Sequence, residues 1–142
     1  MKDHRIPRIT AKILIPFILL FALYVQFHGD FGPGGGFQAG VIFGAAFILH
    51  SLIFGVRRAR EVFPPRLLEI GVATGALLYA GVGVVTMLNG GQYLNYDYLD
   101  IAHPIHSQHL GILLVELGVG ITVSCVMITI FLAFAARGRR KA

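Results

Sequence analysis

The chain alternates between long apolar runs and short polar connections. Four runs, at residues 9–27, 37–56, 67–88 and 110–136, are apolar throughout most of their length. Each is long enough to cross the hydrocarbon core of a bilayer, which takes roughly 20 helical residues. A helix is the element that satisfies its own backbone hydrogen bonds in that environment. The pattern therefore predicts an all-α integral membrane protein, with four transmembrane helices in one domain covering residues 1–142.

Composition supports this fold class. Hydrophobic residues make up 56% of the 142 residues and charged residues 13%, and the mean hydropathy is +0.74, values typical of membrane proteins. The first apolar run is followed by glycine and proline with no small-residue cleavage site, so it is expected to be a retained helix. Cys125 is the only cysteine, which excludes a disulfide framework within the chain.

The basic residues predict the orientation of the helices. All twelve Lys and Arg lie outside the two connections 29–36 and 89–108. They are Lys2, Arg5, Arg8 and Lys12 around the start of the first helix, Arg57, Arg58, Arg60 and Arg66 between the second and third, and Arg137, Arg139, Arg140 and Lys141 after the fourth. Basic connections stay in the cytoplasm, so both termini are expected on the cytoplasmic side.

A glycine-rich turn, HGDFGPGGGFQAG from His28 to Gly40, separates the first two helices. Its glycines can adopt positive φ and allow another backbone to approach closely. The start of the second helix leaves unpaired N–H groups, whose partners can be water, a side chain or a neighbouring subunit. A tight structural hairpin on the outer side is the simpler interpretation. The candidates for the hairpin or for a partner contact are His28, Pro33, Gly34, Gly35, Gly36, Phe37 and Gln38.

Three ionisable residues are candidates for an ion or proton path. Glu116 lies six residues into the last apolar run, about 10 Å inside its outer boundary at 1.5 Å per residue. Because burial disfavours a charged carboxylate, Glu116 either takes part in transport or is a protonated or hydrogen-bonded residue that holds helices together. His50 could pass protons, although a hydrogen bond to a neighbouring helix is the simpler expectation. Glu69 is expected to form an interfacial ion pair with Arg66.

Other features are expected to be structural. Two Gly-x-x-x-Gly spacings, Gly40 with Gly44 and Gly71 with Gly75, allow close helix packing. Pro64 and Pro65 are expected to form a simple turn.

The outer connection contains Tyr93, Tyr96 and Tyr98, a residue type typical of the membrane interface, so it is expected to rest on headgroups or a partner chain. His103, His106 and His109 follow Asp97 and Asp100. They could hold a divalent metal if the stretch were helical, but Pro104 interrupts the pattern. We therefore expect water-exposed polar groups and no metal. Nucleotide, nucleophile-elbow, haem and cluster motifs are absent from the sequence.

Two segments carry a family resemblance: LYVQFHGDFGPGGGFQAG, from Leu23 to Gly40, and HLGILLVELGVGITV, from His109 to Val123. They resemble the B-type subunit (MnhB/MrpB) of the Mrp/Mnh multisubunit cation/proton antiporters. Pro33, Gly34, Gly35, Gly36 and Phe37 match that family's outer hairpin, and Glu116 matches its membrane acid.

The resemblance implies a small accessory subunit in a complex of six or seven different membrane proteins. Such a complex exchanges cytoplasmic Na⁺ for outer H⁺ across the inner (plasma) membrane of a prokaryote. The subunit is a transporter component without a cofactor. Similar modules occur in membrane-bound hydrogenases and other relatives of respiratory complex I, so a redox-driven pump is the alternative.

Overall fold

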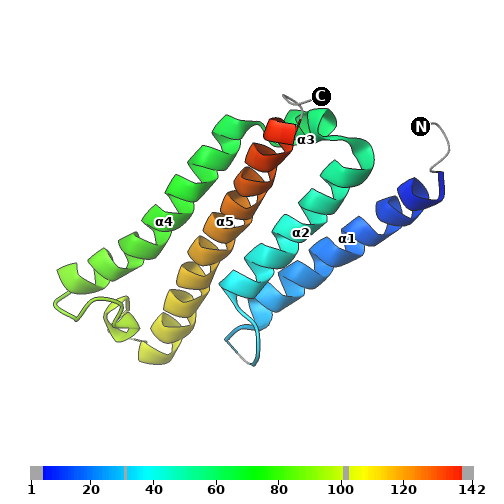
Figure 1. Cartoon of the computed structure of the whole chain (residues 1–142). Helices are drawn as coiled ribbons and strands as arrows, with labels where there is room; N and C mark the ends of the chain where they lie inside the picture. The colour runs from blue at the N-terminus through cyan, green and yellow to red at the C-terminus, as the bar shows by residue number, and fades with distance from the viewer. Residues whose placement is uncertain (1–4, 31, 101–102, 139–142) are drawn as a thin grey trace.

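The computed structural model describes residues 5–30, 32–100 and 103–138. Its elements are α1 (Arg5–His28), α2 (Gly36–Phe54), α3 (Val56–Val62), α4 (Pro65–Leu88), the 3₁₀ helix η1 (Tyr96–Tyr98) and α5 (Pro104–Gly138) (Figure 1). No strand occurs in these ranges. Four of the helices, α1, α2, α4 and α5, are long and apolar enough to cross a membrane. The predicted fold class is thus confirmed.

Prolines and glycines set the ends of several helices. Pro104 does not interrupt a helix as expected; it begins α5, ahead of the expected start at residue 110, because proline is favoured in the first turn. Pro65 begins α4 in the same way. α2 ends at Phe54, where Gly55 has a φ of 96°. The short helix α3 follows, so the connection before the prolines is more than the simple turn expected.

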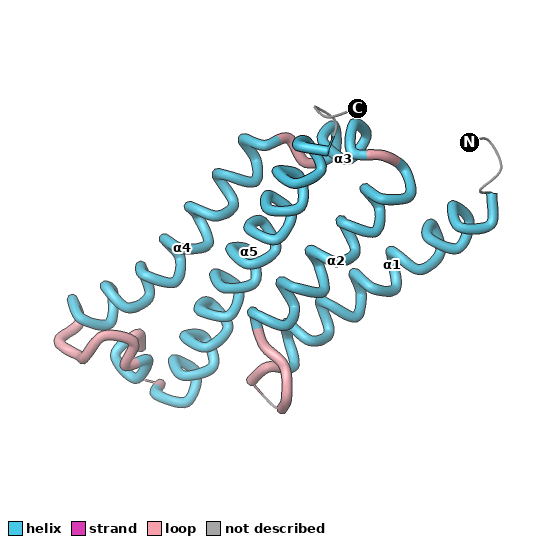
Figure 2. The backbone as a smooth tube through the Cα atoms, in the orientation of Figure 1, coloured by secondary structure: helices cyan, strands magenta, loops and turns pink. Residues whose placement is uncertain are grey.

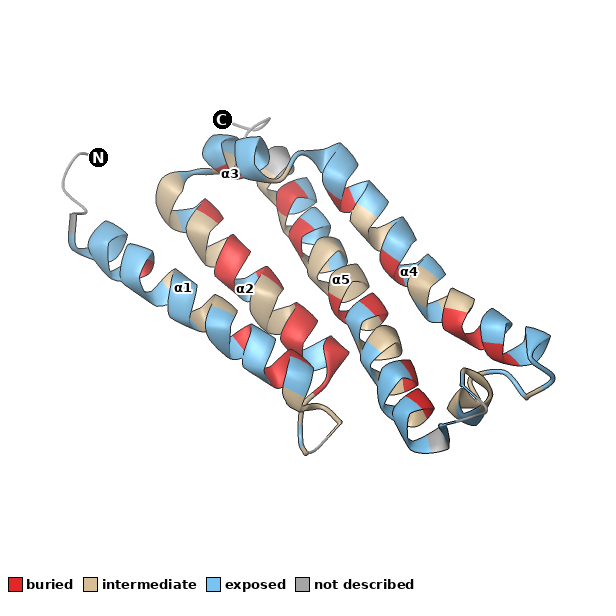
Figure 3. Ribbon diagram, turned by 180° about the vertical axis from the view of Figure 1, so that it is seen from behind, coloured by how far each residue is buried: buried red, intermediate tan, exposed pale blue. Residues whose placement is uncertain are grey.

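The long helices form an open row (Figures 1 and 2). α5 packs between α4 and α2, while α1 packs on α2 and makes little contact with α5. Between 22% and 33% of the most apolar window in each long helix is buried. Exposed residues accordingly cover much of α1 and α4 (Figure 3). Such large apolar faces need lipid or other protein chains to cover them.

Glycines allow both neighbours of α5 to approach it closely. A Cβ atom at Gly40 in α2 would lie 2.8 Å from the carbonyl oxygen of Gly120. A Cβ atom at Gly75 in α4 would lie 2.6 Å from the carbonyl oxygen of Gly118. A real Cβ atom does not come this close to another atom, so glycine is the residue that fits at both positions. The close packing predicted from the Gly-x-x-x-Gly spacings is confirmed.

Larger side chains join the helices at the end of the row that contains α3. A buried cluster there consists of Phe47, Ala59, Leu68, Ile128 and Leu132, which come from α2, α3, α4 and α5. The cluster explains why α3 is held against the long helices even though it has only 7 residues.

At the opposite end, the connection between α4 and α5 packs on the helices themselves. The ring of Tyr93 contacts Gly83 of α4, and the ring of Tyr96 contacts Gly111 of α5. The hydroxyl of Ser107 also donates a hydrogen bond to the carbonyl oxygen of Tyr96, at 2.7 Å. Two of the tyrosines expected at headgroups or a partner chain therefore cover glycines of their own chain.

The α4–α5 contact predicts the outcome of two matched substitutions. Gly75→Ala places a methyl group against the backbone of α5 and should lower the free energy of unfolding by about 1–3 kcal/mol, the usual cost of overpacking. Gly81→Ala, in the same helix, adds a methyl group with nothing within 4 Å. Because alanine favours helix more than glycine, this control should be neutral or stabilising. Thermal unfolding of the purified protein, followed by circular dichroism, measures both changes, and equal stabilities would contradict the packing argument.

Candidate functional site: a glycine cradle around Glu116

The turn between α1 and α2 folds back onto the end of α1. The N–H of Gly32 donates to the carbonyl oxygen of His28, at 3.1 Å, and the N–H of Gly35 donates to that of Val25, at 3.2 Å. Gly35 has a φ of 124°, a conformation that other residues rarely adopt. This geometry allows the chain to turn and start α2 at the next residue, Gly36.

Glu116 of α5 lies directly against this turn. A Cβ atom at Gly29 would lie 2.5 and 2.6 Å from the two carboxyl oxygens of Glu116, and one at Gly35 would lie 3.0 Å from its Oε1. Gly36 faces the main-chain carbonyl of Glu116 with no room for a side chain. These three glycines, Gly29, Gly35 and Gly36, are called the glycine cradle below. They make the space that the carboxyl group occupies.

The start of α2 gives the cradle a favourable potential for a carboxylate. The first backbone N–H groups of a helix have no partner within the helix, and the helix dipole places a partial positive charge there. Residues 13–56 and 67–136 contain no Lys or Arg. The parts of the chain around Glu116 therefore provide no Lys or Arg side chain to pair with its carboxyl group. The positive potential that the fold places beside Glu116 is therefore that of the start of α2.

Glu116 also lines a pocket of about 230 Å³, together with Gln26, Asp30 and His109. His109 Nδ1 pairs with Asp30 Oδ2, which ties the turn to the first turns of α5. Gln26 is 6% exposed, and its Nε2 has no hydrogen-bond partner among the described residues. The pocket thus combines two carboxyl groups, an imidazole and an unsatisfied amide donor.

The other residues predicted for the turn surround the cradle, and Gln38 Oε1 reaches it, 3.7 Å from the position of a Cβ atom at Gly35. The ring of His28 stacks on that of Tyr24, with centroids 5.2 Å apart. Pro33, Phe37 and Gln38 are exposed.

The structure does not bring His50 or Glu69 to Glu116. His50 lies in the part of α2 nearest α3, where its ring is 4.8 Å from that of Phe54. Its buried Nδ1 has no hydrogen-bond partner in the described ranges, so the expected bond to a neighbouring helix is wrong. Glu69 is exposed and lines a separate pocket with Arg60.

The ion pair predicted between Glu69 and Arg66 is also wrong. The ion pairs between described residues join His103 to Asp100 and His109 to Asp30. Arg66 is the second residue of α4 and both side chains are exposed, where an ion pair contributes little stability.

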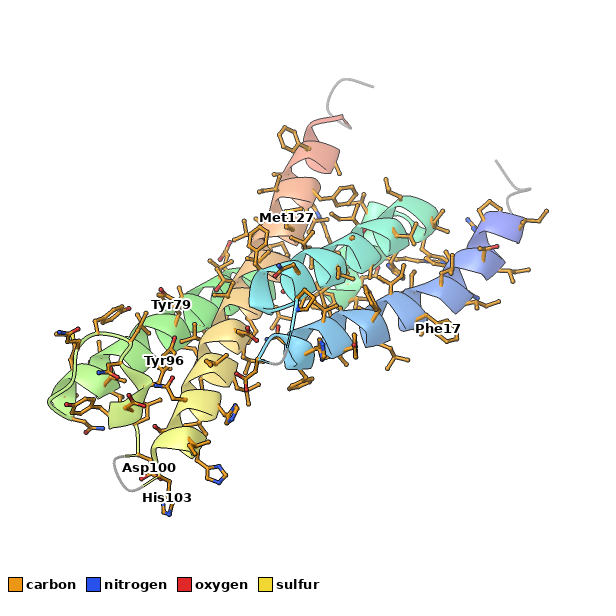
Figure 4. All side chains as sticks on the ribbon, turned by 90° about the horizontal axis from the view of Figure 1, so that it is seen from below. Phe17, Tyr79, Tyr96, Asp100, His103 and Met127 are labelled. Atoms are coloured by element: carbon orange, nitrogen blue, oxygen red, sulfur yellow. The ribbon has the colours of Figure 1, made fainter. Side chains whose placement is uncertain are left out.

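The three outer histidines have different surroundings. His103 Nδ1 lies 3.4 Å from Asp100 Oδ2, and both residues precede α5 (Figure 4). The ring of His106 is 6.4 Å from that of His103, whereas His109 faces Asp30. In the part of the chain that the structure describes, no three His, Cys, Asp or Glu side chains are grouped to hold a metal ion.

Tyr96 adds a proton-bearing group near this end of α5. Burial raises the pKa of its hydroxyl above the ordinary value, and nearby Tyr79, Glu116 and Tyr93 raise this pKa further. Tyr79 and Tyr96 lie close together in Figure 4. The hydroxyl therefore keeps its proton at neutral pH.

Sequence reasoning missed Asp30 and Gln26. Asp30 belongs to the turn and Gln26 to the last part of the first apolar run, and neither position shows a functional pattern. The sequence feature that could have identified them is their position, since both are polar residues near the outer end of the first helix. Their pocket depends on contact with His109, 79 positions from Asp30, which spacing along the chain does not reveal.

The fold and the site together define a multi-pass membrane protein that holds an ionisable side chain in one of its membrane-length helices. A family model described as "Domain related to MnhB subunit of Na+/H+ antiporter" matches residues 6–129. The chain belongs to this MnhB family, as the resemblance of its two segments predicted.

Individual relatives agree with this assignment. A protein of Staphylococcus haemolyticus (strain JCSC1435), named "Putative antiporter subunit mnhB2", is 36% identical over 138 residues. A protein of Staphylococcus aureus (strain Newman) with the same name is 37% identical over 138 residues. Each match covers 95% of this chain and 97% of the relative, so the similarity extends through all four long helices.

The cradle predicts a difference between two glycines with positive φ. Alanine at either Gly35 or Gly55 should cost about 1–2 kcal/mol of stability for the backbone conformation alone. Gly35→Ala also presses on Glu116 and should cost about 1 kcal/mol more, whereas a Cβ atom at Gly55 meets nothing within 4 Å. Thermal unfolding of both variants, each with and without Glu116→Ala, measures the extra term as a double-mutant cycle. If Gly35→Ala still destabilised the protein more than Gly55→Ala in the Glu116→Ala background, the carboxyl group would not occupy the cradle.

Proposed function

We propose that this chain is a small membrane subunit of a multisubunit Na⁺/H⁺ antiporter, which exports Na⁺ in exchange for H⁺ across the inner (plasma) membrane of a prokaryote. The main support is the similarity to antiporter subunits along 95% of the chain. In this proposal the chain is a transporter component rather than an enzyme, and it needs no cofactor of its own.

The open row of helices supports assembly with other Mrp/Mnh-type membrane subunits. Large apolar side chains are exposed along the outer face of α1; for example, Phe17 is 64% exposed and Leu20 61%. The chain also has few ionisable groups in its long helices, too few to line a complete ion path. A hetero-oligomer supplies both the missing contacts and the remaining polar groups.

Glu116 is the residue we assign to ion or proton exchange. Its carboxyl group lies in the glycine cradle at the positive end of α2, which favours the charged form, while its place in an apolar helix favours the protonated form. These opposing effects leave the carboxyl group able to gain and lose a proton or to meet a cation. Ionisable residues at membrane depth are rare and commonly mark ion pathways and proton relays.

Glu116→Gln should lower Na⁺-dependent proton movement by about tenfold or more, because a positioned proton-transfer group typically contributes at least that factor. The substitution keeps the size and hydrogen-bonding capacity of the side chain and removes its titration. Proton movement in everted membrane vesicles, measured with a pH-sensitive dye after addition of Na⁺, provides the rate.

Two controls accompany this measurement. Glu61→Gln changes an exposed acid on α3 and should leave the rate unchanged. Mass spectrometry of the complex that co-purifies with a tagged chain should find the same hydrophobic subunits for wild type and for Glu116→Gln. Unchanged transport would remove Glu116 from the mechanism, and co-purifying iron–sulfur or nickel subunits would assign the chain to a redox-driven pump instead.

We also propose that the end of the row containing α3 faces the cytoplasm. The start of α1, α3 and the last turns of α5 lie at this end, and the turn before α2 and η1 lie at the other (Figure 1). Arg57, Arg58 and Arg60 of α3 belong to this end. Lys2, Arg139, Arg140 and Lys141 lie outside the described residues. The proposed N-in, C-in orientation follows from the positive-inside rule.

This orientation predicts which positions are reached from outside the cell. In a Cys125→Ser background, Gln92→Cys in the outer connection should react with a membrane-impermeant maleimide added to intact cells. Arg58→Cys should react only after the cells are opened. Both parent residues are exposed, so accessibility within the fold is matched, and the reverse pattern would show the opposite orientation.

A further inference from the structure

Three cavities follow one another along α1, α2 and α5. The Glu116 pocket shares Gln26 with a second cavity of about 220 Å³, which is also lined by Phe43 and Ser124. Phe43 and Ser124 in turn line a third cavity of about 340 Å³, which reaches His50. The shared residues place the three cavities end to end, and this row of cavities is called the α1–α5 groove below.

The arrangement of the helices explains the groove. α1 and α5 both pack on α2 but make little contact with each other, so a space remains between them over one face of α2. Small residues of that face, Ala39, Gly40 and Ala46, line the cavities. Because their side chains are short or absent, they leave the space between α1 and α5 unfilled.

Unsatisfied polar atoms occur along this groove. Among the described residues, two buried side-chain nitrogens have no hydrogen-bond partner, Gln26 Nε2 and His50 Nδ1. Gln26 lines the first and second cavities and His50 the third. Leaving a buried polar group unsatisfied costs about 1–3 kcal/mol, and ordered water is the usual partner of such groups in proteins.

The groove also offers water an intermediate binding point. Ser124 Oγ donates to the carbonyl oxygen of Gly120, at 2.8 Å, and a hydroxyl oxygen has two lone pairs with which to accept hydrogen bonds. Each cavity is far larger than the space of roughly 30 Å³ that one water molecule occupies in the liquid. Gln26, Ser124 and His50 thus supply polar partners in all three cavities.

We propose that water fills the α1–α5 groove and conducts protons between Glu116 and His50, past Gln26 and Ser124. A proton leaves the carboxyl group of Glu116 for the first water and moves by successive transfers along the water file. His50 accepts a proton at one ring nitrogen and releases one from the other, so no electron or further reactant is needed. The role in transport rests on the proposed antiporter function; the presence of water does not.

Cysteine accessibility in the assembled complex tests whether water enters. In a Cys125→Ser background, Ser124→Cys places a nearly isosteric thiol in the groove, and Val126→Cys places one on the same helix outside it. A thiol reacts as the thiolate, which forms where water is present. With 2-aminoethyl methanethiosulfonate on membrane vesicles, Ser124→Cys should react at least about tenfold faster than Val126→Cys, the difference that a factor of ten in thiolate population gives. Equal rates would overturn the proposal.

Chemical rescue tests whether protons use the water. His50→Ala should lower Na⁺-dependent proton movement, and imidazole added to the medium should restore it by filling the enlarged third cavity. Phe54→Ala removes the ring whose centroid lies 4.8 Å from that of His50 and is the control, which imidazole should not affect. A loss in His50→Ala without rescue, or no loss, would overturn the proton path.

These outcomes separate the two proposals. A dry groove or unaffected transport in His50→Ala, with Na⁺/H⁺ exchange retained by the complex, overturns the water file and leaves the antiporter function standing. Absence of Na⁺/H⁺ exchange from the wild-type complex overturns the proposed function and the transport role of the groove, while the labelling rates still decide whether the groove holds water.

Discussion

The contact between the backbone of α5 and the start of α2 is the constraint on which the rest of the structure depends. Gly36 faces the main-chain carbonyl of Glu116 so closely that no side chain fits between them. This contact places the positive end of α2 next to the Glu116 carboxyl group. It also fixes the turn, because Gly35 must take a φ of 124° to begin the helix there while its N–H reaches Val25 of α1. One backbone contact therefore positions three helices and the ionisable group.

The same use of glycine extends along α5 and explains the open shape. Gly118 lets α4 approach on one side, and Gly120 lies against α2 and Gln26 on the other. Close backbone packing gives α5 two main neighbours, which leaves α1 attached mostly through α2. In a soluble protein this row would expose too much apolar surface. In a membrane complex, lipid and neighbouring subunits cover the open faces, since helix association there depends on packing and not on the hydrophobic effect.

Hydropathy predicted the four long helices because a segment that crosses the bilayer needs a minimum apolar length and must satisfy its own backbone hydrogen bonds as a helix. Glycine spacing predicted the close packing onto α5. The sequence did not predict α3, since a helix of 7 residues is stabilised by a cluster drawn from four helices. It also misjudged Pro104, because proline suits the first turn of a helix as well as it breaks the middle. The pairing of His109 with Asp30, the unsatisfied nitrogens of Gln26 and His50, and the isolation of Glu69 depend on tertiary contacts that single-sequence patterns do not contain.

The cradle and the groove have the same cause, which is the packing of helices through glycines. A helix that meets its neighbour through glycines leaves no side chains to fill the space on either side of the contact. Beside Glu116 this space admits the carboxyl group, and between α1 and α5 it continues as cavities lined by short residues of α2. Polar atoms without protein partners remain stable in such a space if water reaches them. A membrane subunit with few ionisable residues can in this way connect Glu116 near one end of its helices with His50 near the other, without placing a charged side chain at every step.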